Sequence, residues 1–249
     1  MKVFLFLAVF CFAHFKIAFS QNQDWLDVSQ TELKILRDNF SVYGYNEDAN
    51  RKADLLFLID TSGSLSGSEF NEEKKFITNL LNEISVGYEA TRVEVIPFGS
   101  TASRFIQQIS APDRTKNKCT FNEQFNPMPQ SIEGYATNMK EAFRLAEDVC
   151  IGAYSGEKRG TLATFKTAVL LITDGIWNRP RSDPSPVEYA RDLLTAGAEI
   201  FAIAVGDNVD YDNLKQVVDD PTKRAFHLKD FDQFAELATY LRGGNMVLL

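Results

Sequence analysis

The sequence predicts an α/β protein built on one doubly wound, mostly parallel, six-stranded sheet with helices on both faces. Uninterrupted apolar runs such as Leu55–Ile59 and Ala168–Thr173 are typical of strands that are covered on both faces. Between these runs lie segments whose apolar residues recur at helical spacing. Alternation of strands and helices through most of the 249 residues favours a parallel sheet.

Six segments are predicted as strands. Three of them, at residues 55–59, 168–173 and 200–205, are continuous apolar runs, so we expect them in the middle of the sheet. Two others follow each other closely enough to form a hairpin. The expected strands are Leu55–Ile59, Arg92–Phe98, Arg104–Ile109, Ala168–Thr173, Ile200–Val205 and Ala225–Leu228.

Five segments between and after these strands are predicted as helices. In the first, Phe70, Ile77 and Leu80 share one side at helical spacing. Another ends just before Gly197, and glycine is common directly after a helix. The expected helices are Phe70–Ile84, Asn138–Val149, Pro186–Ala196, Tyr211–Val218 and Asp230–Leu241.

The first twenty residues have the pattern of a secretory signal peptide. Lys2 precedes the almost wholly apolar run Val3–Ala13, and small residues occur in the stretch that ends at Ser20. The run is too short to favour a membrane span, and a buried N-terminal helix is the alternative. We expect a secreted protein with a signal at 1–20, an extension at 21–53, a folded domain at 54–242 and a tail at 243–249.

The mature chain is expected to be strongly acidic. Loss of Lys2 and Lys16 with the signal takes the formal net charge from −8 to about −10. Such a surface should repel nucleic acid and anionic membranes. We therefore expect neither a nucleic-acid partner nor a membrane span.

Two features fit an extracellular location. Cys119 and Cys150 remain after signal removal, and a cysteine pair in a secreted protein suggests one disulfide, with two buried free thiols as the alternative. Asn39 begins an Asn-Phe-Ser sequon and is a candidate glycosylation site.

The candidate binding residues follow the predicted buried strands. Asp60, Ser62 and Ser64 form a D-x-S-x-S pattern after the first strand, and Asp174 follows the strand at 168–173. Thr137 directly precedes a predicted helix. Ligands of doubly wound sheets bind beyond the carboxyl ends of the strands, where the strand order reverses, so we expect these side chains to converge.

Two carboxylates and three hydroxyls make an all-oxygen ligand set. Mg²⁺, or Mn²⁺, prefers oxygen ligands, whereas zinc favours the nitrogen or sulfur that this set lacks. With few protein charges, one coordination position is left for water or for an oxygen from another molecule. The alternative is that Asp and Ser after a strand only cap the next helix.

These motifs resemble the metal-ion-dependent adhesion site of the von Willebrand factor type A (vWA) family, in its secreted extracellular-matrix type. Similar elements are the D-x-S-x-S pattern and the segments Thr137–Phe143, Leu171–Gly175 and Ile200–Gly206, and the resemblance spans about Asp54 to Leu241. It implies a Rossmann-like vWA fold and a Mg²⁺ or Mn²⁺ ion held by Asp60, Ser62, Ser64, Thr137 and Asp174. Met139 stands where many members have a second threonine, which implies an altered surrounding of the metal rather than its loss.

The resemblance also implies the kind of partner. In this family a carboxylate of the partner completes the metal's shell, so we expect an extracellular protein such as collagen or another matrix glycoprotein. Arg179 and Arg181 would steer an acidic ligand inward, or else belong to an ordinary solvated turn. The expected rim residues are Leu65, Tyr135, Trp177, Arg179 and Arg181.

No catalytic motif is present in the sequence, so we do not expect an enzyme. A Ser-His-Asp hydrolase needs a histidine, and the mature chain has only His227, in a short apolar strand. Walker, G-x-G-x-x-G and G-x-S-x-G motifs are missing. Two functions stay open: metal-dependent ligand binding, and a structural matrix protein in which the domain is an assembly unit without metal-dependent binding.

Overall fold

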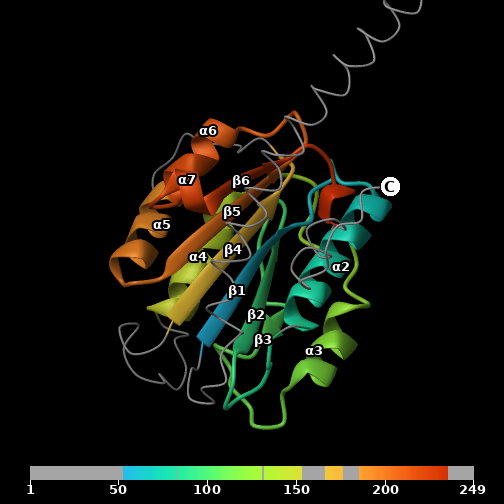
Figure 1. The fold of residues 1–249 in the computed structure, drawn as a ribbon, viewed down its shortest axis with the longest axis vertical. Helices are drawn as coiled ribbons and strands as arrows, with labels where there is room; N and C mark the ends of the chain where they lie inside the picture. The colour runs from blue at the N-terminus through green and yellow to red at the C-terminus, as the bar shows by residue number, and fades with distance from the viewer. Residues whose placement is uncertain (1–52, 83, 131, 153–165, 176–184, 235–249) are drawn as a thin grey trace, which may run out of the picture.

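The computed structural model describes residues 53–82, 84–130, 132–152, 166–175 and 185–234 (Figure 1). Several sequence predictions lie outside the described residues. These are the signal, the extension with Asn39, the rim residues Trp177, Arg179 and Arg181, the C-terminal tail and most of the helix expected at Asp230–Leu241.

One six-stranded sheet forms the centre of the domain, in the order β3-β2-β1-β4-β5-β6. Every neighbouring pair is parallel except β2 and β3, which form the predicted antiparallel hairpin. The doubly wound, mostly parallel fold is thus confirmed. The strands are β1 (Ala53–Asp60), β2 (Arg92–Phe98), β3 (Ile106–Gln107), β4 (Lys166–Thr173), β5 (Glu199–Val205) and β6 (Ala225–Leu228).

Helices cover both faces of this sheet (Figure 1). On one face α2 and α3 pack over a core that is rich in phenylalanine, and on the other α4 and α5 pack over a mainly aliphatic core. The helices are α2 (Gly67–Asn82), α3 (Lys118–Phe125), α4 (Met139–Cys150), α5 (Pro186–Thr195), α6 (Tyr211–Leu214), the 3-10 helix η1 (Lys215–Val217) and α7 (Pro221–Arg224).

Alternation along the central strand explains the two cores. Leu55, Phe57 and Ile59 of β1 face the α2 side, whereas Leu56 and Leu58 face the α4 side. All five side chains are at most 1% exposed, as the continuous apolar run predicts. Burial of this kind stabilises the domain by roughly 1.5–3 kcal/mol for each large apolar side chain.

Two short helices, α3 and α7, were not predicted. α3 has only Phe121 and Phe125 as buried residues, which is too short an apolar pattern to stand out. Its local signal is a capping box, in which the Asn117 side chain accepts from the Thr120 amide and the Asn117 amide donates to Thr120 Oγ1. The helix expected at Tyr211–Val218 is instead divided into α6 and η1.

The predicted disulfide is wrong for this structure, because both cysteines are free. Cys119 is exposed near the start of α3, on one side of the sheet. Cys150 ends α4 and packs against the core on the other side, where burial raises the pKa of its thiol. The sheet therefore separates the two sulfur atoms, which no spacing in the sequence reveals.

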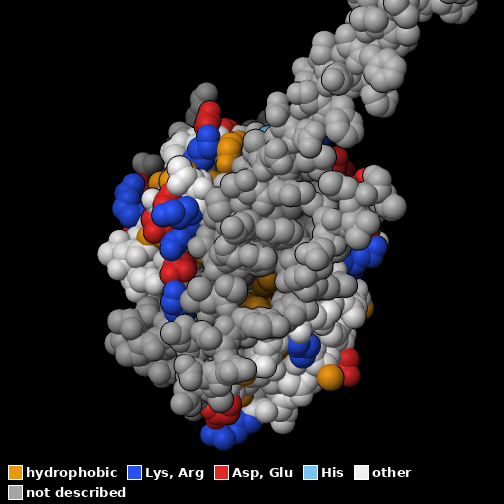
Figure 2. Space-filling view, viewed as in Figure 1, with side chains coloured by type: hydrophobic (Ala, Val, Ile, Leu, Met, Phe, Trp, Pro, Cys, Tyr) orange, Lys and Arg blue, Asp and Glu red, His pale blue; other side chains and the backbone are white. Residues whose placement is uncertain are grey.

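The surface carries mixed charges. On the face shown in Figure 2, basic and acidic side chains of the described residues alternate around the rim rather than gathering in one basic patch. Among the helices that the structure describes, none is both long and apolar enough to cross a membrane.

Candidate metal centre

The end of the sheet where β1 and β4 terminate is its topological switch point. The chain leaves β1 toward α2 on one face and leaves β4 toward α5 on the other, so a crevice opens between the two connections. Asp60 is the last residue of β1, and Asp174 is the first residue after β4. The two predicted carboxylates thus stand at neighbouring strand ends.

The loop after β1 is fixed to the adjacent strand. The Thr61 amide and the Thr61 Oγ1 hydroxyl both donate to the carbonyl oxygen of Phe98, at 2.8 Å and 3.0 Å. The Ser62 amide turns back and donates to Asp60 Oδ1 at 2.9 Å. Asp60 and Ser62 are at most 1% exposed, so this turn holds the carboxylate in a fixed position inside the protein.

Hydrogen bonds link the loop after β1 to Asp174, and the last residue of β4 to Asp60. Ser62 Oγ and Ser64 Oγ are 2.9 Å apart, and Ser64 Oγ donates to Asp174 Oδ1 at 3.0 Å. On the other side, Thr173 Oγ1 donates to Asp60 Oδ2 at 2.5 Å. The structure therefore brings Asp60, Ser62, Ser64 and Asp174 together, as the strand-end argument predicts.

Thr137 reaches the same place from a third loop. It is 6% exposed, and a Cβ atom added to Gly175 would lie 2.7 Å from Thr137 Oγ1. The loop is attached to the first one, because the Gly63 amide donates to the Tyr135 carbonyl oxygen at 3.1 Å. The third predicted hydroxyl thus lies against the residue that follows Asp174, and glycine at 175 makes room for it.

Comparison with known proteins identifies this arrangement. The model of the von Willebrand factor type A domain matches residues 54–239, which is most of the chain and includes all five candidate residues. The chain belongs to the vWA family. The resemblance seen in the sequence is therefore confirmed at the level of the family.

Curated relatives of this vWA domain are matrix proteins. The human collagen alpha-5(VI) chain is 25% identical over 228 residues, covering 89% of this chain and 8% of the relative. Mouse matrilin-2 is 28% identical over 191 residues, covering 76% of this chain and 19% of the relative. The chain thus spans less than a fifth of either protein's length.

Solved structures support the same fold. The proximal thread matrix protein 1 of the mussel byssus matches with a TM-score of 0.64 at 19% identity, covering 77% of this chain and 47% of the other. The same protein with a zinc-occupied MIDAS motif also has a TM-score of 0.64, at 20% identity, covering 78% of this chain and 46% of the other. At this identity the likeness concerns the fold alone.

Among the described residues, no hydrogen bond or ion pair joins a basic side chain to Asp60 or Asp174. Burial, and to a smaller extent the negative charge of Asp174, raise the pKa of Asp60 from 3.8 to about 6, against the hydrogen bonds from Thr173 and Ser62. Burial also raises the pKa of Asp174, and the charge of Glu69 adds to this. Two acids held together in this way favour a positive charge between them.

The donor chemistry of the site fits a hard divalent cation. Asp60, Ser62, Ser64, Thr137 and Asp174 present only oxygen atoms, which suit Mg²⁺ or Mn²⁺. Within the described ranges, no three residues of the types His, Cys, Asp and Glu converge closely enough to hold a metal by themselves. The hydroxyls are therefore an essential part of this ligand set.

The predicted rim is only partly in place. Tyr135 is 78% exposed, and its ring lies against Gly63, where an added Cβ atom would come within 2.6 Å of Tyr135 Cδ1. Leu65 is wrong as a rim residue: it is 4% exposed and packs in the α2-side core. The Leu65 side chain therefore contributes to the core under α2 and not to the rim of the crevice.

Sequence reasoning missed two residues that bear on the site. Thr173 donates to Asp60, and its position opposite the end of β1 follows from the parallel register, in which Ile59 pairs with Ile172. Glu73 is a buried acid of α2 whose pKa responds to Asp60 and Asp174. Its sequence signal is a single charged residue on an otherwise apolar helical face.

Proposed function

We propose that this vWA domain binds a divalent cation, Mg²⁺ or Mn²⁺, and uses it to bind a carboxylate of an extracellular protein partner. The observation that carries the proposal is the hydrogen-bonded chain from Ser62 through Ser64 to Asp174, with Asp60 buried beside it. These groups come from two different strand ends, so a merely local helix cap does not account for them.

The five candidate ligands differ in charge, and this difference gives them different roles. Asp60 and Asp174 would hold the cation by charge, and Ser62, Ser64 and Thr137 would hold it by hydroxyl oxygens. Bound there, the cation supplies a positive charge with free coordination capacity for an outside oxygen. Ser64 is exposed and Asp174 is partly exposed, so a partner can approach from that side. The exposed ring of Tyr135 offers an apolar surface next to this opening.

The partner class follows from the relatives. Collagen VI and matrilins are components of the extracellular matrix, and the proposed partner is a matrix protein such as a collagen or another glycoprotein with an accessible acidic residue. A secreted location belongs to the same proposal, and so does a purely binding, non-enzymatic role. The second candidate is an assembly unit without metal-dependent binding, which the relatives' much greater length favours.

Calorimetric titration with Mg²⁺ and Mn²⁺ tests the metal site. We expect saturable uptake of one ion by the wild type and none by Asp60→Ala. Glu123→Gln, which removes an exposed acid on α3, is the matched control and should bind as the wild type does. Binding of immobilised collagen with and without EDTA then separates the two candidates. EDTA-resistant binding would favour the assembly unit, and no metal uptake would refute the proposed mechanism.

A further inference from the structure

The buried face of α2 contains one residue that does not fit an apolar core. Phe70, Phe76, Ile77, Leu80 and Leu81 line this face, and Glu73 lies among them at 1% exposure. An apolar side chain at 73 would complete the face and cost nothing in desolvation. Burial of an unpaired carboxyl instead lowers stability, which calls for a role that offsets the loss.

No cation of the described residues pairs with Glu73. Its Oε1 atom is buried without a hydrogen bond, and no ion pair of the described residues includes Glu73. Burial raises the pKa of Glu73 well above its usual range, and the charges of Asp60 and Asp174 raise it further. In the metal-free protein, burial and these two negative charges therefore favour the protonated form of Glu73.

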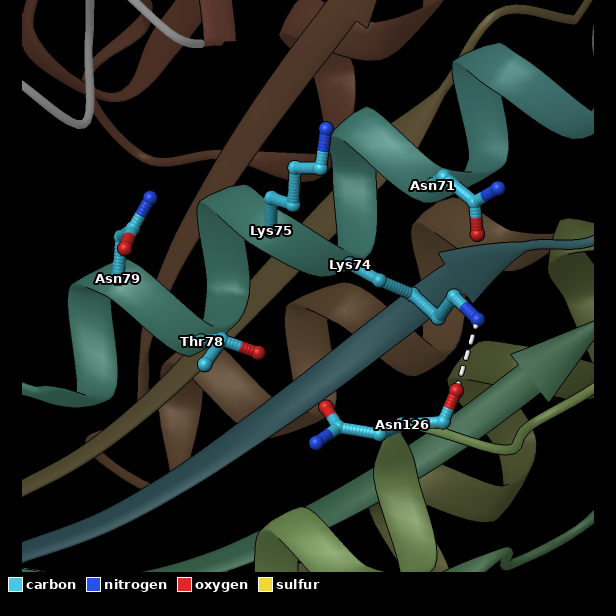
Figure 3. A pocket seen from close by; sticks show the side chains of 6 residues that line it. All are labelled: Asn71, Lys74, Lys75, Thr78, Asn79 and Asn126. Atoms are coloured by element: carbon cyan, nitrogen blue, oxygen red, sulfur yellow. Dashed lines mark hydrogen bonds between the residues drawn. The ribbon is translucent and has the colours of Figure 1, made fainter.

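The neighbouring lysines do not supply the missing charge. Lys74 donates to the carbonyl oxygens of Asn126 and Met128, at 3.0 Å and 3.2 Å, across the hollow of about 510 Å³ on the outer side of α2 (Figure 3). Lys75 pairs with Glu72 at 2.6 Å. Both cations thus have other partners, although they directly follow Glu73 in sequence.

The other elements packed on α2 bring no described cation to Glu73 either. Lys118 of α3 donates to the Asn82 carbonyl oxygen. The segment after β6 packs through Phe234, whose ring centroid is 4.8 Å from that of Phe76. Its charged residues Lys229, Asp230 and Asp232 are exposed. Among the described residues, the charges that raise the pKa of Glu73 are those of Asp60 and Asp174.

We propose that Glu73 is a positioning residue of the metal site, which gives up its proton when the cation binds and strengthens the cation's binding through its negative charge. This inference rests on the proposed function. Glu73 lies on the buried face of α2, whereas the candidate ligands belong to the strand ends and to the loop before α4. It acts from behind the ligands, as a buried charge that the bound cation balances and that no described cation pairs with.

The consequence for affinity follows from linkage. Deprotonation of Glu73 and binding of the cation are linked. If the bound cation favours ionised Glu73, then ionised Glu73 favours the bound cation by the same free energy. If binding lowers the pKa of Glu73 from above the pH of the titration to one unit below it, the metal affinity at that pH rises about tenfold. Removal of the charge should therefore weaken Mg²⁺ about tenfold and leave the ligands in place.

The test compares Glu73→Gln with Glu72→Gln, which removes an acid one residue away on the outer side of the same helix. Mg²⁺ is titrated calorimetrically at neutral pH in two buffers of different ionisation enthalpy, which gives both affinity and the number of protons released. For Glu73→Gln we expect about tenfold weaker binding and a smaller proton release than for the wild type. Glu72→Gln should match the wild type in both.

A second variant excludes a merely structural role. Glu73→Leu should raise the melting temperature in EDTA, since it completes the apolar face, and yet weaken Mg²⁺ as Glu73→Gln does. If the wild type takes up Mg²⁺ but both Glu73 variants keep its affinity and proton release, this inference is overturned and the proposed function stands. If the wild type takes up no Mg²⁺, the proposed function fails, and this inference fails with it.

Discussion

Replacement of Asp60 by asparagine should stabilise the metal-free domain at neutral pH. The Asp60 carboxyl is fully buried at the end of β1, and burial raises its pKa from 3.8 to about 6, with a smaller contribution from the charge of Asp174. Asparagine has the same shape, can still accept from the Ser62 amide, and carries no charge that must be buried. The variant thus removes the charge of this side chain, while its Nδ2 group replaces Oδ2 as the partner of the Thr173 hydroxyl.

The sign and size of the effect follow from the pKa shift. Because the pKa in the folded state lies above that in the unfolded state, protonated Asp60 stabilises the fold below about pH 4, and this stabilisation is lost as the pH rises through about 6. A shift of roughly two pKa units corresponds to about 3 kcal/mol. Asp60→Asn should therefore equal the wild type near pH 4 and exceed it by about 3 kcal/mol at pH 7.

Urea denaturation in EDTA at several values between pH 4 and pH 7 measures this difference. In saturating Mg²⁺ the order should reverse, because only the wild type gains stability from the bound ion. A difference between the two proteins that stays constant from pH 4 to pH 7 would contradict the reasoning, since it would show that Asp60 does not change its ionisation over this interval.

Three further results are expected. Gly175→Ala should weaken Mg²⁺ binding while the protein stays folded, because the new Cβ atom would lie 2.7 Å from Thr137 Oγ1 and displace that hydroxyl; calorimetry with circular dichroism as the control measures both. Asp54→Ala should lower the unfolding free energy by roughly 3–5 kcal/mol in urea denaturation, since it leaves Arg92 buried without its paired carboxylate. Cys119 should react with a thiol reagent in the folded protein, whereas Cys150 should react only after unfolding. Mass spectrometry of the labelled peptides distinguishes the two cysteines.

The sheet could be predicted well because its signals are local. A continuous apolar run such as Leu55–Ile59 fits only a strand that is covered on both faces, and β1 is that strand at the centre of the sheet. The strand-end rule then places Asp60 and Asp174 together without any knowledge of distances. Their pairing is confirmed by the hydrogen-bonded chain through Ser64.

What could not be predicted depends on which way a side chain points after the chain turns. Leu65 is adjacent to the site in sequence, but its side chain enters the α2-side core. Cys119 and Cys150 lie on opposite sides of the sheet, a relation that follows from the positions of α3 and α4 and not from spacing. These errors have one cause, since sequence distance does not encode the face of the sheet.

The acids at this end of the sheet bear on the choice between the two candidate functions. An assembly unit without metal-dependent binding would gain nothing from burying Asp60 and Glu73, because burial raises the pKa of both carboxyls and the charge of Asp174 raises both further. The same three carboxyls become favourable when a divalent cation balances them. The metal-free protein should therefore be the less stable form at neutral pH, and the cation should contribute to folding as well as to recognition. Such coupling favours the metal-dependent function over the assembly unit on physical grounds.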